Sequence, residues 1–212
     1  MTQTIMTTHN YSTFLQATVR WTTWMRIVQG VGNVCNGRKD RFDKADILEQ
    51  AVDMCSDGKL KWVDEIGRDF HDTANNVDDE LKYREDSLLT KRCIPKRHIT
   101  FKIKNSLGAT HTPEISNPAN FYILAQQNAV AVISYEEMKP YLHNSGDGVV
   151  LKIPGSELEF VIQPTEYTTI TVKPAFCYLE EKRAMQRRFI NSILESSPSG
   201  EMSTETDTTA PE

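Results

Sequence analysis

A short segment near the middle of the chain carries carboxylates and a lysine at a spacing that suits phosphodiester hydrolysis. Residues 67–82 read GRDFHDTANNVDDELK. An acid and a lysine two residues apart on a strand point to the same face, while the residue between them points into the core. Such hydrolysis needs a divalent ion on hard oxygen ligands and a group that manages the attacking water. We therefore predict that Glu80 binds the ion, that Leu81 packs inward and offers its carbonyl, and that Lys82 polarises the water or the developing charge.

The acid–x–lysine triplet occurs four times, so its surroundings must decide which copy matters. The triplets begin at Asp57, Glu80, Glu137 and Glu180. The last two lie in helical contexts, and Asp57 lies in a turn. The triplet at Glu80 alone follows a turn and a preceding carboxylate on an expected strand, which selects it as the candidate site.

The second metal ligand depends on the turn before Glu80. Asp72, on the neighbouring strand, is the predicted partner. A two-residue turn at 75–76 would set Asp72 opposite Asp79 and turn Glu80 away, whereas a three-residue loop would bring Asp72 and Glu80 together. Asp69 and Asp79 therefore stay open as alternatives for the second ligand.

The order of these features resembles a known enzyme family. A short helix, then Gly-Arg-acid-x-x-Asp, a hairpin and Glu-Leu-Lys, is similar to the PD-(D/E)xK nucleases, and most of all to the small PvuII-like type II restriction endonucleases. The similarity covers about residues 45–135. It implies a mixed central β-sheet flanked by helices and Mg²⁺-dependent cleavage of double-stranded DNA. It assigns the metal to Asp72 and Glu80, assistance of the nucleophile to Lys82, and an auxiliary acid role to Asp69.

Residues after the hairpin add candidate DNA contacts. Residues 98–104 alternate strictly, so one strand face is apolar and the other carries Lys102 and Lys104, which could meet phosphates. Farther on, the Gly-Ala-Thr-His-Thr run containing His111, followed by Asn117 and Pro118, also resembles the nuclease family. The resemblance implies that this segment, with His111 and Asn117, lies in the DNA groove.

Composition indicates one intracellular α+β domain, residues 1–196, followed by a disordered acidic tail, residues 197–212. The net charge of −5 argues against nucleic acid, but the tail holds four acids and no base, so the rest is nearly neutral. The start of the chain lacks the features of a signal peptide, and no apolar run approaches the roughly 20 residues of a membrane span. We expect a cytoplasmic protein with its four cysteines reduced, because they form no close ligand pairs.

The periodicity of apolar residues predicts the elements around the site. An aromatic-rich helix over residues 11–31 is a candidate for packing in the core or in a dimer, because a symmetric cut in DNA needs two active sites. We also predict the following: a helix from Asp43 or Asp46 to about Met54; a strand over 98–104; a helix beginning at Asn117-Pro118; a buried strand over 129–133; a short helix with a capping box at Ser134 and Glu137; strands over 149–153, 158–162 and 168–172; and a helix over 175–195.

Two other functions fit the same residues. The acids of the hairpin could form a solvated face of a non-catalytic DNA-binding or interaction protein. A phage or repair nuclease without sequence specificity would share the same core. Cleavage of plasmid DNA separates the three hypotheses.

Overall fold

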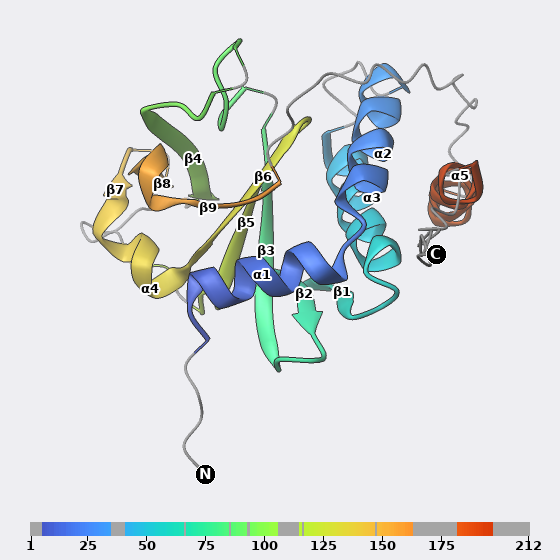
Figure 1. The fold of residues 1–212 in the computed structure, drawn as a ribbon, viewed down its shortest axis with the longest axis horizontal. Helices are drawn as coiled ribbons and strands as arrows, with labels where there is room; N and C mark the ends of the chain where they lie inside the picture. Colours follow the sequence, from blue (N-terminus) through green and yellow to red (C-terminus); the bar gives the residue numbers. More distant parts are fainter. Residues whose placement is uncertain are drawn as a thin grey trace, which may run out of the picture.

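The computed structural model describes residues 6–34, 41–65, 67–84, 86–92, 94–105, 115, 117–146, 148–162 and 182–196 (Figure 1). Several sequence-based predictions lie outside these residues: the strand at 168–172, the state of the tail at 197–212, the thiols of Cys35, Cys93 and Cys177, and the position of His111. Cys55 is a buried free thiol, as expected. None of the helices in the described part of the chain is long and apolar enough to span a membrane.

A six-stranded mixed sheet forms the centre of the fold. Its order is β1-β2-β3-β5-β6-β9, where β3 and β5 pair in parallel and all the other neighbours are antiparallel. The bounds are β1 Leu60–Glu65, β2 Arg68–Asp72, β3 Val77–Tyr83, β5 Phe121–Gln126, β6 Ala129–Ser134 and β9 Glu159–Ile162. All residues of β5 are buried, as are those of β6 up to Ile133, which confirms the buried strand predicted there. The α+β class and the mixed sheet flanked by helices are thereby confirmed.

A smaller sheet packs against one face of the first. It consists of β4 (His98–Asn105), β8 (Gly148–Pro154) and β7 (Leu142–Asn144), with β8 in the middle. The predicted alternation of β4 holds, because Ile99, Phe101 and Ile103 are buried and Lys102 is exposed. These apolar side chains share a core cluster with residues of β5 and β6 such as Tyr122 and Ile133.

Helices pack on the other side of the large sheet. They are α1 (Thr8–Thr18), α2 (Trp21–Val34) and α3 (Arg41–Cys55), while α5 (Lys182–Ser196), farther along the chain, packs against α2 and α3. Figure 1 shows α1 crossing the sheet while α2 and α3 run beside each other. The helix predicted from residue 43 or 46 to 54 corresponds to α3, and the one predicted over 175–195 corresponds in its described part to α5. Short elements complete the path: α4 (Tyr135–Met138), η2 (Lys139–Tyr141) and η3 (Gly155–Glu157).

The single helix predicted over residues 11–31 is wrong, because the chain breaks between α1 and α2. Val19 is extended, and Arg20 binds the end of α3 through its backbone N–H to the Cys55 carbonyl and its guanidinium to the Met54 carbonyl. These contacts replace helical hydrogen bonds that the periodicity alone would favour. The aromatic side chains, including Trp21 and Trp24, are buried in the protein's own core. That face is therefore not free to serve as a dimer interface.

The helix predicted at Asn117-Pro118 is also wrong. The chain turns at Asn117, which has a φ of 54°, and then enters β5 beside β3. An apolar run such as residues 121–125 suits a buried helix or a buried strand equally, and pairing with β3 decides for the strand. The predicted cap at Ser134 is present, because its side chain accepts from the Glu137 backbone N–H.

Candidate active site on the β2–β3 hairpin

The hairpin between β2 and β3 has a four-residue loop, neither of the two lengths considered from the sequence. Asp72 pairs with Val77 and Phe70 pairs with Asp79, so residues 73–76 form the loop. Continuing this register by one step places Asp69 opposite Glu80. Because side chains alternate along strands, Asp69 and Glu80 share one face, and Asp72 and Asp79 share the other.

Glu80 and Lys82 lie side by side on β3, as the triplet predicted. The Lys82 ammonium donates to Oε1 of Glu80, whose side chain is 8% exposed. Oε2 of Glu80 is buried and has no hydrogen-bond partner among the described residues. Leu81, between them, is buried in the core on the opposite face, also as predicted. Glu80 therefore has one oxygen held by a cation and one left available for another ligand.

Asp69 reaches the same place from β2. Its Oδ2 accepts a hydrogen bond of 2.6 Å from the backbone N–H of Leu81. The pKa of Asp69 is raised to about 8, mainly by burial and next by the negative charges of Glu80 and Glu49, while the Lys82 charge and the Leu81 N–H lower it. Ionisation of Asp69 is therefore unfavourable here, chiefly because its carboxyl is removed from water and secondly because two other acids lie near it.

Glu49 of α3 is a site residue that the sequence reasoning missed. Its Oε2 accepts from the indole N–H of Trp62 at 3.1 Å. Its pKa is raised to about 7, mainly by burial; the bond from Trp62 lowers it, and the charge of Glu80 contributes to raising it. The available signal was an acid on the helix that leads into the hairpin, but helix periodicity cannot reveal which strand residues that acid will approach.

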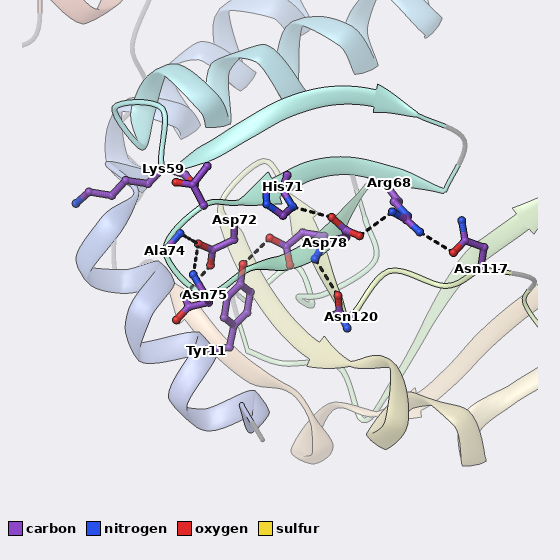
Figure 2. Close-up of polar contacts among 12 residues, drawn as sticks. Tyr11, Lys59, Arg68, His71, Asp72, Ala74, Asn75, Asp78, Asn117 and Asn120 are labelled. Atoms are coloured by element: carbon purple, nitrogen blue, oxygen red, sulfur yellow. Dashed lines mark hydrogen bonds and ion pairs between the residues drawn. The ribbon is translucent and has the colours of Figure 1, made fainter. Parts of the chain in front are cut away.

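Asp72, the predicted second ligand, does not join Glu80. It is fully buried on the opposite face, where Oδ1 accepts from the backbone N–H groups of Ala74 (2.8 Å) and Asn75 (3.1 Å). Its Oδ2 accepts from the Asn75 side-chain amide at 2.7 Å, and Figure 2 shows these bonds closing the turn. Asp72 thus stabilises the loop, and Asp69 takes the position beside Glu80 that the sequence-based assignment gave to Asp72.

Asp79, the other alternative, is also remote from Glu80's side of the sheet. It is fully buried, and its Oδ2 accepts from the Tyr11 hydroxyl of α1. Burial raises the pKa of Asp79 well above its ordinary value, more than the Tyr11 bond lowers it. This carboxyl anchors α1 to the hairpin.

The predicted DNA contacts that the structure describes lie in two different parts of the fold. Lys102 is exposed on β4 of the small sheet, and Lys104 is in the same strand with its side chain outside the described residues. Asn117 does reach the hairpin, where its Oδ1 accepts from the Arg68 guanidinium at 2.6 Å. The groove contact that the resemblance implied for Asn117 stays a prediction.

Comparison of the sequence with protein-family models and curated proteins, and of the fold with solved structures, gives no match. The chemistry of the site therefore has to be inferred from its own residues. Among the described residues, no group of three or more His, Cys, Asp or Glu side chains is arranged to hold a metal ion. The site offers a pair of carboxylates instead, with Glu49 nearby.

Proposed function

We propose that this protein is a Mg²⁺-dependent endonuclease that hydrolyses phosphodiester bonds of double-stranded DNA, with a restriction-endonuclease-like core. The observation that carries the proposal is the convergence of Asp69, Glu80 and Lys82 on one face of the β2–β3 hairpin. It differs from the sequence-based assignment only in the aspartate.

The donor set fits Mg²⁺ better than it fits a structural metal. Mg²⁺ in enzymes is usually held by one or two carboxylates, with water and substrate phosphate completing an octahedron. The unpartnered Oε2 of Glu80 is an available ligand atom, and a cation beside Asp69 would offset the burial and the neighbouring acids that raise the pKa of Asp69. A site of two carboxylates is also compatible with the absence of a three-ligand group in the described part of the chain.

Each side chain then has a definite task. Mg²⁺, when bound, supplies a Lewis acid for the phosphoryl oxygen and lowers the pKa of water. Asp69 is oriented by the Leu81 N–H and Glu80 by the Lys82 ammonium, so both carboxylates are fixed before substrate arrives. Lys82 keeps further N–H donors for the attacking water or for the charge that develops on the phosphate.

Sequence-specific cleavage would place this protein among the type II restriction enzymes. Cutting both strands of a symmetric site requires two hairpins, so we infer a homodimer. The aromatic face of α1 and α2 is buried within the chain, and the interface must therefore use another surface.

Plasmid cleavage tests the proposal directly. Purified protein is incubated with supercoiled DNA in Mg²⁺ or in EDTA. Discrete fragments in Mg²⁺ alone indicate a restriction enzyme, and diffuse degradation indicates a nuclease without sequence specificity. An absence of cleavage by well-folded protein refutes the nuclease and favours the non-catalytic alternative.

Substitutions then test the residue assignment. Lys82→Ala should abolish cleavage and leave DNA binding in place, whereas Lys152→Ala, at an exposed lysine of β8, should change neither. Asp69→Asn should abolish cleavage, while Asp72→Asn should retain it in whatever fraction stays folded. Loss of cleavage in folded Asp72→Asn with normal cleavage by Asp69→Asn would refute the assignment of Asp69.

A further inference from the structure

Arg68 is held in an unusual way beside the candidate site. Its guanidinium donates through one terminal nitrogen to Oδ2 of Asp78 at 2.8 Å and through the other to Oδ1 of Asn117 at 2.6 Å. The other oxygen of Asp78 lies 2.9 Å from Nδ1 of His71. Figure 2 shows His71, Asp78, Arg68 and Asn117 as one continuous chain of polar contacts. None of these contacts is needed for the roles assigned to Asp69, Glu80 and Lys82.

Asp78, the carboxylate that holds Arg68, is itself fixed by hydrogen bonds of its backbone. The backbone N–H of Asp78 donates to Oδ1 of Asn120 at 2.9 Å, and the Asn120 N–H donates to the Asp78 carbonyl at 2.7 Å. The Asn120 carbonyl accepts in turn from the N–H of Tyr135. Both the N–H and the carbonyl of Asp78 are thus bonded to Asn120, in the segment before β5. The carboxylate that orients Arg68 therefore has little freedom to move.

Arg68 still has donors to offer. A guanidinium carries five N–H groups, and each terminal nitrogen has a second N–H that the contacts to Asp78 and Asn117 do not use. The side chain is 29% exposed, whereas its Nε is buried and has no partner among the described residues. The accessible donors are therefore on the outer end of a planar group whose orientation is already set, so little side-chain entropy is lost when an anion binds.

Its position suits a phosphate next to the reacting one. Arg68 directly precedes Asp69 in β2, and Asp78 precedes Glu80 by two residues, or about 7 Å along a strand. A site built from Asp69, Glu80 and Glu49 repels a polyanion, so a fixed, always-charged group at its border would favour binding of the DNA backbone.

We propose that Arg68 is a backbone-phosphate contact of this nuclease, and that Asp78 and Asn117 are its positioning residues. The inference rests on the proposed function for the nature of its ligand, a phosphodiester of double-stranded DNA. Arg68 contacts a phosphate that is not cleaved and carries no sequence information, so it contributes to binding on any sequence.

Fluorescence anisotropy of a labelled duplex oligonucleotide tests this in the full chain. The Lys82→Ala protein is used with Mg²⁺ present, and the dissociation constant is measured over a series of salt concentrations. Adding Arg68→Ala should raise the dissociation constant about ten-fold and make the salt slope shallower by about one. Arg20→Ala is the matched control, because Arg20 also pairs with an aspartate at 2.9 Å but lies between α1 and α2 and bonds to the end of α3. It should leave the slope unchanged.

Two further variants separate charge from position. Asn117→Ala keeps the charge of Arg68 and removes one anchor, so affinity should fall by less than in Arg68→Ala while the slope stays. Arg68→Lys should restore the slope with only part of the affinity, because an ammonium cannot reproduce the fork. These two variants also decide the matter if Arg68→Ala does not fold.

The inference is overturned if Arg68→Ala matches Arg20→Ala in affinity and slope, or if Arg68→Lys binds as tightly as the parent. Plasmid cleavage by the wild type is scored separately. Cleavage together with binding that is indifferent to Arg68 refutes this inference alone. Binding that depends on Arg68 without any cleavage refutes the nuclease and leaves a DNA-binding protein.

Discussion

Replacing Asp69 by Asn should stabilise the metal-free protein while destroying its activity. An asparagine side chain keeps an oxygen that can accept from the Leu81 N–H, and it has no carboxyl that must take up a proton when the chain folds near neutral pH. Burial and these two neighbours raise the pKa of Asp69 from 3.8 to about 8. The native carboxyl is therefore a source of instability in the metal-free protein near neutral pH.

The sign and size of this change in the free energy of unfolding follow from proton linkage. When folding raises the pKa of a group, its contribution to the free energy of unfolding is fully present below the pKa of the unfolded state. That contribution is lost as the pH rises toward the pKa of the folded state. For Asp69 the window runs from about pH 4 to about pH 8. At pH 7 the loss extends over about three pH units, which corresponds to about 4 kcal/mol at 1.36 kcal/mol per unit.

Urea denaturation in EDTA, followed by tryptophan fluorescence, measures the effect. The Asp69→Asn protein should match the wild type near pH 4 and exceed it by about 4 kcal/mol at pH 7. Saturating Mg²⁺ should then stabilise the wild type and not the variant, because only the wild type binds it. Asp72→Asn is the control from the same hairpin: it weakens three hydrogen bonds and should lower stability at pH 7 by about 1–3 kcal/mol.

A different result would refute the reasoning. If the stability difference between Asp69→Asn and the wild type were the same at pH 4 and pH 7, folding would not raise the pKa of Asp69 as the prediction requires. If Mg²⁺ stabilised both proteins equally, the ion would bind elsewhere.

Two further substitutions test the surrounding fold by urea denaturation. Tyr11→Phe removes the donor to the fully buried Asp79 and should lower the free energy of unfolding by about 1–3 kcal/mol, with equal stability showing that this contact does not anchor α1. Gly155→Ala would place a Cβ 2.2 Å from the Lys96 carbonyl oxygen, so it should destabilise by about 1–3 kcal/mol, and an unchanged midpoint would mean that η3 shifts without penalty.

Local patterns were sufficient for the elements whose burial has a clear period. The alternation of β4, the apolar run of β6 and the Glu-Leu-Lys order of β3 each predict one strand and the direction of its side chains. That Glu80 and Lys82 share a face is a consequence of strand geometry and needs no partner. The sequence by itself therefore determined half of the candidate site.

Local patterns failed where two structures were equally compatible with the residues. The break at residues 19–20 contains no glycine or proline, and only the docking of Arg20 on α3 makes it favourable. The sequence from Pro118 onward is compatible with a helix. It forms β5 instead because β3 pairs with it, and this long-range pairing cannot be predicted from the local sequence.

The tertiary structure alone decided which acids meet. Whether Asp69 or Asp72 faces Glu80 depends on the length of one loop, because a shift of one residue in register turns every side chain to the other face. Asp79 directly precedes Glu80 on β3 and points to the other face whatever the loop length. The four-residue loop places Asp69 beside Glu80 and leaves Asp72 to close the turn. Glu49 comes from α3, the helix before β1, and its approach to Glu80 depends on how α3 packs on the sheet. Alternation along a strand is local chemistry, whereas register and packing are properties of the whole fold.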